Sequence, residues 1–429
     1  MRVFVKSFGC STNLADGEVL AGCLQAAGYE VVNDISKADL VVYNTCAVKG
    51  STENRMISVL KAVPRGKKLI VGGCLPLINV ERLQNEMRFD GLIGPAAGEK
   101  IAEVAGRVFN GEKVIAIENA EDALPRLCLP RRRINPVVSI IPVNYGCLGS
   151  CAYCCVVFAR GRLRSYSVAE IIELVKKDVA EGTREFWITS QDTACYGRDK
   201  GTNLASLLNA ICNIKGDFMV RVGMMTPNLV LDILEELIEA FRNERVLKFV
   251  HLPVQSGDDQ VLKRMRRFYS VNDFTEIVET FRESFPEITL STDVICGFPG
   301  ETTEAFQKTL ELIEKIKPDI VNVSKFFARP GTPAIGMSED FVSLAEIKRR
   351  STTAALLARK VSYERNQRWM EWKGEVLVDE VGKITGSWMG RNFAYKPIVI
   401  KSEGKLLGKK LQVEVVKACA TYLEGKVCE

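Results

Sequence analysis

Three cysteines stand close together in the segment NYGCLGSCAYCC, residues 144–155: Cys147, Cys151 and Cys154. A structural zinc site normally takes four protein ligands from two short pairs, and a second pair is missing here. Cys155 follows at once, but it is a poor fourth ligand because the side chains of successive residues diverge. The spacing Cys-x3-Cys-x2-Cys instead suits an iron-sulfur cluster that uses three thiolates and leaves one iron open to a substrate or cofactor.

Three further cysteines, Cys10, Cys46 and Cys74, each follow a predicted strand in the first part of the chain. A single cysteine in such a place is usually a small packing residue. The ends of parallel strands, however, meet at one edge of a sheet, where ligands collect. Three thiols at that edge favour a second metal site. The four strands predicted in this part read VFVKSF, ADLVVYNT, KLIVGG and DGLIG.

These loops require a fold that places them together, and the predicted fold class is α/β in three parts. Residues 1–125 alternate short apolar strands with helical patterns, which indicates an open parallel sheet. Residues 136–365 repeat a strand-helix unit about every 35 residues, which is typical of a partial (β/α)6 barrel. Residues 369–429 change to short alternating strands separated by glycines, which predicts a small antiparallel barrel. The six barrel strands read VVSIIPVNYG, EFWITSQDT, FMVRVGMMT, FVHLPVQS, ITLSTDVICG and DIVNVSKFF.

Basic side chains are concentrated near the first cysteine loop. From Arg126 to Ala169 there are seven arginines and no acidic residue. Arg160, Arg162 and Arg164 alternate, and on an extended segment this spacing puts all three on one side. We expect them to contact the phosphates of an RNA, although a solvated basic face is the alternative.

Aromatic residues in the last part allow two readings. Trp388, Phe393 and Tyr395 lie among lysines and could stack on single-stranded nucleic acid. They could equally fill the small barrel. The residues of this region alone do not favour either reading.

The composition bounds the function class. With 47% hydrophobic and 26% charged residues, 14 cysteines and a formal charge of +5, the chain is typical of a soluble globular protein whose thiols stay reduced. The start MRVFVKSFGC reads as a strand rather than a signal peptide, and no run is long enough to span a membrane, so we expect a cytoplasmic protein. His251 is the only histidine, which excludes histidine-based triads and multi-histidine metal sites.

The motif CLGSCAYC resembles the cluster loop of the radical S-adenosylmethionine superfamily, whose fold is a partial barrel. Several further motifs together resemble the methylthiotransferases. In chain order they are the three strand-end cysteines, ARGRLRSYS, TSQDTACYG, HLPVQSGDDQVLKRMRR, GFPGET and FFARPGTP. The C-terminal part is similar to their TRAM domain. NYGCLGSCAYC and TSQDTACYGRD further resemble the archaeal and eukaryotic branch, which acts on N6-threonylcarbamoyladenosine at position 37 of tRNA.

The resemblance implies two 4Fe-4S clusters and S-adenosylmethionine as cofactors. It makes Cys147, Cys151 and Cys154 ligands of the cluster that cleaves S-adenosylmethionine to a 5'-deoxyadenosyl radical. A second, auxiliary cluster would carry the sulfur to be inserted. Its ligands would be Cys10, Cys46 and Cys74.

Other residues at the predicted catalytic face correspond to positions that hold S-adenosylmethionine in the family. Tyr153 is expected to pack near the adenine of the cofactor. For the two glycines, ordinary turn chemistry is an equal alternative. The expected cofactor-binding residues are Tyr153, Gln191, Asp192, Gln255, Ser256, Gly297 and Gly300.

The resemblance makes methylthiolation of C2 of the adenine the expected reaction. A radical is needed because the aromatic C-H there has no acidic proton for a base to remove. The expected partner is the anticodon stem-loop of tRNA, and the reaction also needs an electron donor and a sulfur donor that the sequence does not identify. We expect a monomer. One alternative is a methylthiotransferase acting on a ribosomal-protein aspartate. Another is a non-catalytic RNA-binding iron-sulfur protein, which two sets of three ligands disfavour because structural sites are closed.

Overall fold

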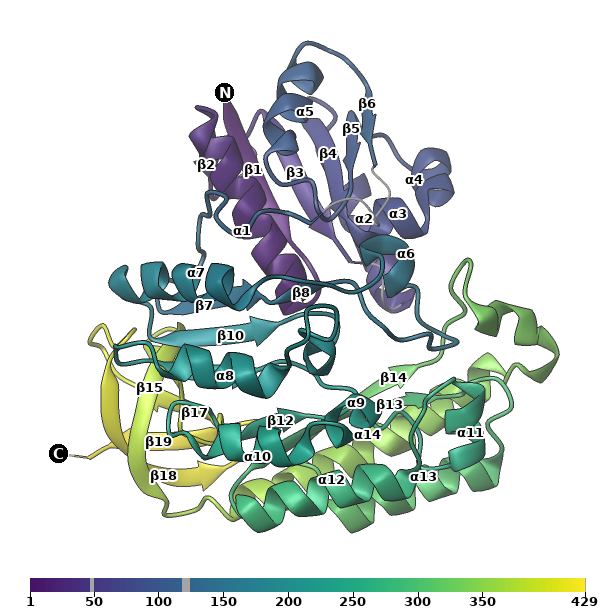
Figure 1. The fold of residues 1–429 in the computed structure, drawn as a ribbon. Helices are drawn as coiled ribbons and strands as arrows, with labels where there is room; N and C mark the ends of the chain where they lie inside the picture. Colours follow the sequence, from purple (N-terminus) through teal and green to yellow (C-terminus); the bar gives the residue numbers. More distant parts are fainter. Residues whose placement is uncertain (47–49, 118–123, 429) are drawn as a thin grey trace.

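The chain forms three packed units in a computed structural model that describes residues 1–46, 50–117 and 124–428. An α/β sheet unit contains the N-terminus, a partial barrel occupies the middle, and a small closed barrel contains the C-terminal strands (Figure 1). The predicted fold class is confirmed. No helix within the described ranges is long and apolar enough to cross a membrane.

The first unit is a six-stranded parallel sheet in the order β2-β1-β3-β4-β5-β6. Its strands are rich in valine, leucine and isoleucine, and every residue of β3 is buried because helices cover both faces. Helices α1 and α5 pack on one face, and α2, α3 and α4 on the other. The elements are β1 (Arg2–Ser7), α1 (Ser11–Ala26), β2 (Glu30–Val32), η1 (Ile35–Lys37), β3 (Leu40–Thr45), α2 (Gly50–Lys61), β4 (Lys68–Gly73), α3 (Cys74–Ile78), α4 (Val80–Glu86), β5 (Gly91–Ile93), α5 (Lys100–Phe109) and β6 (Val114–Ala116).

The second unit is a partial barrel of six parallel strands. Two three-stranded sheets, β11-β10-β7 and β12-β13-β14, are joined by isolated parallel bridges that pair Val220 with Val246 and Met224 with His251. Its elements are β7 (Val138–Pro142), β8 (Asn144–Tyr145), α6 (Val156–Arg160), β9 (Arg164–Ser165), α7 (Val168–Ala180), β10 (Glu185–Thr189), η2 (Thr193–Cys195), α8 (Leu204–Cys212), β11 (Met219–Val222), α9 (Pro227–Leu231), α10 (Leu234–Arg242), β12 (Phe249–His251), α11 (Asp259–Arg264), α12 (Val271–Ser284), β13 (Thr289–Cys296), α13 (Thr303–Ile316), β14 (Ile320–Lys325), η3 (Pro333–Asp340) and α14 (Leu344–Gln367).

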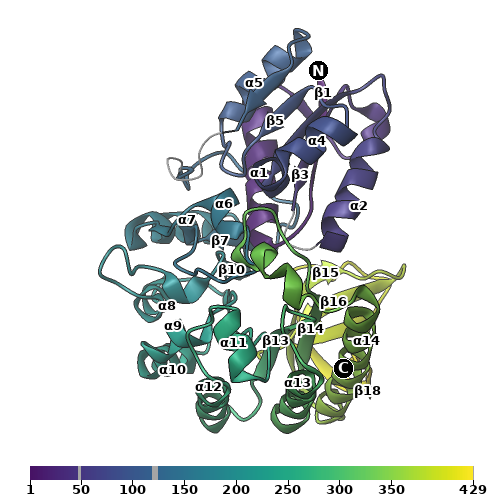
Figure 2. The same ribbon diagram turned by 90° about the vertical axis from the view of Figure 1, so that its right-hand side faces the viewer.

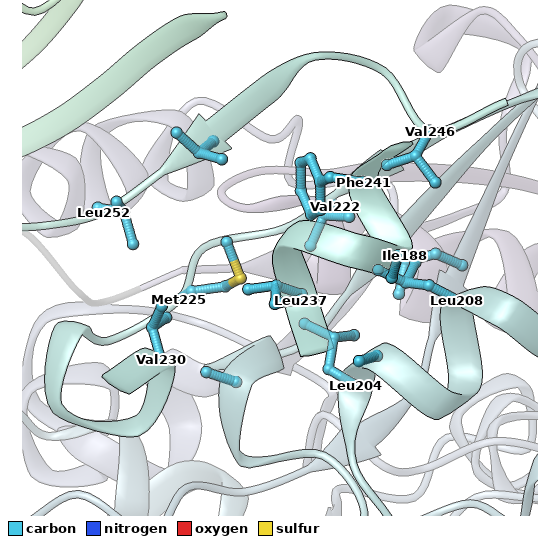
Figure 3. Packing of buried hydrophobic residues seen from close by; sticks show 14 of the residues in the cluster. Ile188, Leu204, Leu208, Val222, Met225, Val230, Leu237, Phe241, Val246 and Leu252 are labelled. Atoms are coloured by element: carbon cyan, nitrogen blue, oxygen red, sulfur yellow. The ribbon is translucent and has the colours of Figure 1, made fainter. Parts of the chain in front are cut away.

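The largest core fills the space between these strands and their outer helices. Ile188 and Val222 on the strands meet Leu208, Leu237 and other helix residues, all essentially inaccessible to solvent (Figure 3). Burial of this much apolar surface makes the strands a rigid frame. The loops at the carboxyl ends of the strands are therefore held on a fixed scaffold.

The third unit is a closed barrel in the order β15-β16-β17-β19-β18, which packs beside α14 (Figure 2). Phe393 packs against Trp369 and Trp372, and Tyr395 against Phe249 of β12. These contacts favour a packing role over a stacking platform for Phe393 and Tyr395. The strands are β15 (Lys373–Val381), β16 (Ser387–Arg391), β17 (Pro397–Lys401), β18 (Lys410–Ala418) and β19 (Leu423–Val427).

Candidate metal and cofactor site

The first set of cysteines lies at one edge of the N-terminal sheet. Cys10, Cys46 and Cys74 follow β1, β3 and β4, which are neighbours in the sheet. Cys10 caps α1, and Cys74 is the first residue of α3. Burial raises the pKa of the Cys74 thiol to about 12, and the charges of Cys46 and Cys10 also act on it. Parallel topology thus brings three distant cysteines together, as the strand pattern indicated.

Two glycines allow these loops to approach one another. Gly73 has a φ of +89°, and a Cβ there would lie 2.3 Å from the Thr45 carbonyl oxygen. Gly9 has a φ of +113°, and its Cβ would lie 3.0 Å from the Cys46 sulfur. An L side chain at either position would be strained and would collide. Glycine is therefore required beside each of these cysteine-bearing turns.

The second set of cysteines lies in the loop between β8 and α6. The Gly149 amide donates to the Cys147 sulfur at 3.2 Å, and Arg267 Nη1 donates to the Cys151 sulfur at 3.2 Å. The Cys154 amide bonds back to the Cys151 carbonyl at 3.1 Å, which folds the loop into a turn. Donors aimed at sulfur stabilise thiolates and the clusters that they hold.

The donor chemistry fits iron-sulfur clusters better than a single ion. Within the described residues, no group of three or more His, Cys, Asp or Glu side chains is arranged to hold one metal ion directly. Thiolates of a cluster bind different irons, so they need not converge on one point. Burial, and next the Asp192 charge, raise the pKa of Cys147 to about 12. Because cluster ligands must be deprotonated, assembly of a cluster at this loop would release protons.

Two glutamines expected to bind the cofactor have buried amide oxygens that accept no hydrogen bond from any described residue. They are Gln191, after β10, and Gln255, after β12. Gln255 also has a φ of +71°, a conformation that costs a residue other than glycine free energy and clusters at functional sites. Two unsatisfied acceptors at the carboxyl edge of the barrel fit a ligand that supplies hydrogen-bond donors.

The remaining polar residues of this face serve the loops themselves. Asp192 Oδ1 accepts from the amides of Ala194 and Thr226, each at 3.1 Å. Ser256 Oγ accepts from the Asp258 amide at 3.2 Å. Both side chains therefore close turns, and their buried positions lie next to the two glutamines along the chain.

The glycines after β13 also occupy constrained turns. The Gly297 amide donates to Glu301 at 2.7 Å. Gly300 has a φ of +80°, and a Cβ there would lie 2.8 Å from the Arg264 guanidinium. Tyr153 packs edge-on against Phe298, which lies between these glycines, with ring centroids 6.3 Å apart. The turn thus connects the cysteine loop to the β13 edge.

The arginines after the cysteine loop do not share one face, so this expectation was wrong. Arg160 ends α6, is only 2% exposed and binds Asp16. Arg162 is exposed, and Arg164 lies half-buried in β9. The sequence pattern assumed an extended segment, whereas a helix precedes Gly161 and turns Arg160 inward. Arg160 is therefore removed from the expected phosphate contacts.

Other residues behave as follows. Cys155, Cys195 and Cys296 are buried, as expected for thiols that fill space. His251 Nε2 lies 3.1 Å from Asp293 Oδ1, within hydrogen-bond distance. The sequence reasoning missed Arg267, a buried cation beside Cys151, although it lies inside the recognised string HLPVQSGDDQVLKRMRR.

Comparison with known proteins extends these observations. Three sequence models of protein families match this chain. The Radical SAM superfamily matches residues 141–313, and the TRAM domain matches residues 374–428. A family described as "Uncharacterized protein family UPF0004" matches residues 2–94. The "Probable threonylcarbamoyladenosine tRNA methylthiotransferase" of Pyrococcus abyssi is 42% identical over 100% of this chain and 99% of its own length. The Homo sapiens threonylcarbamoyladenosine tRNA methylthiotransferase is 35% identical over 99% of this chain and 74% of its own length.

A solved structure also shares the fold. The radical S-adenosylmethionine methyltransferase TsrM from Kitasatospora setae superposes with a TM-score of 0.56 at 15% identity, over 78% of this chain and 74% of that chain. At this identity the likeness concerns the fold alone. Full-length similarity to the curated relatives carries the family assignment. The chain belongs to the threonylcarbamoyladenosine tRNA methylthiotransferase family of radical S-adenosylmethionine enzymes.

Proposed function

We propose that this chain transfers a methylthio group to C2 of N6-threonylcarbamoyladenosine at position 37, in the anticodon stem-loop of tRNA. One observation carries the proposal beyond family membership. The Ser11 hydroxyl, next to Cys10, lies 2.6 Å from the Thr189 hydroxyl, two residues before Gln191. The edge of the sheet that bears the first three cysteines therefore faces the carboxyl edge of the barrel. A substrate between these edges would be within reach of both.

The chain's own residues would bind and orient the cofactors. When bound, a cluster held by Cys147, Cys151 and Cys154 would supply the electron that cleaves S-adenosylmethionine to a radical, and one held by the other three cysteines would hold the sulfur for transfer. Arg267 donates a hydrogen bond to the Cys151 sulfur and would stabilise it as a thiolate. Gln191 and Gln255 would accept hydrogen bonds from the cofactor through their unpaired oxygens. The protein thus contributes binding, orientation and exclusion of water.

The RNA is supported by the C-terminal barrel and by the exposed Arg162. The TRAM match covers the barrel, and the relatives above are named for a tRNA substrate. Arg162 is exposed and follows α6 directly after Gly161, so a phosphate near the cysteine loop could reach it. The ribosomal-protein alternative lacks support of this kind, and the non-catalytic alternative does not explain two unpaired glutamine oxygens at the barrel edge.

The decisive experiment is mass spectrometry of nucleosides from tRNA that carries N6-threonylcarbamoyladenosine. The tRNA is incubated anaerobically with reconstituted protein, reductant, sulfide and S-adenosylmethionine. We expect a nucleoside that is heavier by one methylthio group. The triple variant of Cys10, Cys46 and Cys74 to alanine should yield no such product but should still form 5'-deoxyadenosine.

A matched control replaces three cysteines outside both sets: Cys128, Cys419 and Cys428. This triple alanine variant should retain the product, because it removes the same number of thiols but no expected ligand. If the wild-type chain forms 5'-deoxyadenosine and leaves tRNA unchanged, the tRNA assignment is wrong. Ribosomal protein is then the next substrate to supply in the same assay.

A further inference from the structure

Asp16 joins the two cysteine sets through two residues of the barrel unit. Arg160 Nη2 donates to Asp16 Oδ2 at 2.5 Å, and the Tyr145 hydroxyl donates to Asp16 Oδ1. Arg160 also lies over the Tyr145 ring, 5.0 Å from its centroid. All three side chains are buried, with Asp16 7% exposed. A buried network of this kind holds its members in one arrangement.

The chain positions of these residues place the junction between the two sets. Tyr145 precedes Cys147 by two residues, and Arg160 ends the short helix that follows Cys154 and Cys155. Asp16 lies on α1, whose N-cap is Cys10. The residues on both sides of the barrel cysteine loop, Tyr145 and Arg160, therefore contact helix α1, which begins at Cys10 of the other set.

Arg160 also lies on a helix that packs against the first set of cysteines. Helix α6, which ends at Arg160, packs against α3, which begins at Cys74. Ala159, the residue before Arg160, lies in the same buried cluster as Cys74. Arg160 Nη1 is buried and has no hydrogen-bond partner among the described residues. A buried guanidinium nitrogen without an acceptor costs free energy, and an anionic acceptor would remove that cost.

We propose that Arg160 is the positioning and charge-compensating residue of Cys10, Cys46 and Cys74, supplied to them from helix α6, which follows the loop that carries the other three cysteines. This inference rests on the auxiliary cluster of the proposed function. Three thiolates leave a 4Fe-4S cluster with net negative charge, which increases by one on reduction. A fixed cation nearby stabilises the reduced form more than the oxidised form, so it raises the midpoint potential.

The test isolates the auxiliary site in the full chain by changing Cys147, Cys151 and Cys154 to alanine. Iron content and an EPR-monitored redox titration then report on the remaining cluster. In this background we expect Arg160→Gln to move the midpoint potential to a more negative value. Arg160→Lys, which retains the charge, should move it less.

The opposite charge gives a second, discriminating variant. Asp16→Asn breaks the same ion pair but leaves the Arg160 charge, so it should move the potential to a more positive value. The double variant should return toward the parent, and it avoids leaving one buried charge alone. Arg131→Gln is the matched control, because it breaks a buried ion pair with Asp178 of similar burial.

The outcomes separate this role from the proposed function. Opposite shifts in Arg160→Gln and Asp16→Asn support the charge role, and shifts in the same direction overturn it because they indicate loosened structure. An unchanged potential in Arg160→Gln also overturns it, while the auxiliary cluster stands. If the parent with intact Cys10, Cys46 and Cys74 binds no iron, the proposal of an auxiliary cluster is wrong, and the proposed role of Arg160 is wrong as well.

Discussion

Arg329 binds Glu53 across the boundary between the barrel and the N-terminal sheet, and both side chains are 2% exposed. Arg329 follows β14, and Glu53 lies on α2. Glu53 also accepts from Arg82 at 2.8 Å. A carboxylate shared by two guanidiniums therefore holds the sheet against the barrel near the cysteine loops.

Removal of this carboxylate should destabilise the chain strongly. Glu53→Ala leaves Arg329 buried and unpaired, which typically costs about 3–5 kcal/mol. Urea denaturation of the metal-free protein measures the change. Lys176→Ala is the control, because it breaks an exposed pair with Glu173 that contributes at most about 1 kcal/mol. Equal effects of the two substitutions would show that the buried pair is not a determinant of stability.

Lys396 should hold the C-terminal barrel to the rest of the chain. Its Nζ lies 2.7 Å from Asp319 Oδ1, and both side chains are at most 3% exposed. Lys396→Met leaves Asp319 with one ion-pair partner among the described residues, Arg365, so we expect looser docking and faster proteolysis between α14 and β15. Lys410→Met, which breaks a more exposed pair with Asp217, should change the cleavage rate little. The proteolysis prediction fails if both variants are cut at the same rate.

Asp379 should make stability depend on pH. Burial raises its pKa from 3.8 to about 7, although Arg391 opposes the shift. Between these two values the folded chain keeps a proton that the unfolded chain releases, so a rise in pH through this window lowers the free energy of unfolding. Asp379→Asn should remove that part of the slope. Denaturation of both proteins from pH 5 to 8 measures the difference, which should grow with pH in favour of the variant.

Gly73→Ala should disturb the turn that carries Cys74. The new Cβ would lie 2.3 Å from a backbone oxygen, and such overpacking costs about 1–3 kcal/mol. Gly28→Ala is the control, because Gly28 also has a positive φ of +87° but has no atom within 4 Å of its added Cβ. The two melting temperatures separate the clash from the backbone strain that both variants share. Equal melting temperatures would contradict the close approach.

Arg162 should contribute to RNA binding through charge alone. Arg162→Ala should weaken tRNA binding and reduce the slope of log affinity against log salt concentration by about 1. Arg242→Ala, an exposed residue on the outer helix α10, is the control. Filter binding at several salt concentrations measures both slopes. An unchanged slope for Arg162→Ala would assign Arg162 to the solvated face.

The strand pattern predicted the four central strands of the N-terminal sheet but missed its two edge strands. β2 and β6 are three-residue edge strands of the N-terminal sheet, and the sequence reading omitted both. Edge strands bury less and alternate over too few residues to give a clear period. Longer buried strands such as β3 were found because apolar side chains fill both faces.

The sequence by itself determined which chemistry is available: one set of three thiols after strands whose ends must share an edge, and a second set of three within a single loop. Only the tertiary structure decided what surrounds them. Arg160 carries the same charge as Arg162, yet one is buried against Asp16 and the other is exposed. Asp16 and Arg160 are 144 residues apart. Local periodicity carries no information about such a contact, because two units must pack before the cation finds its buried partner.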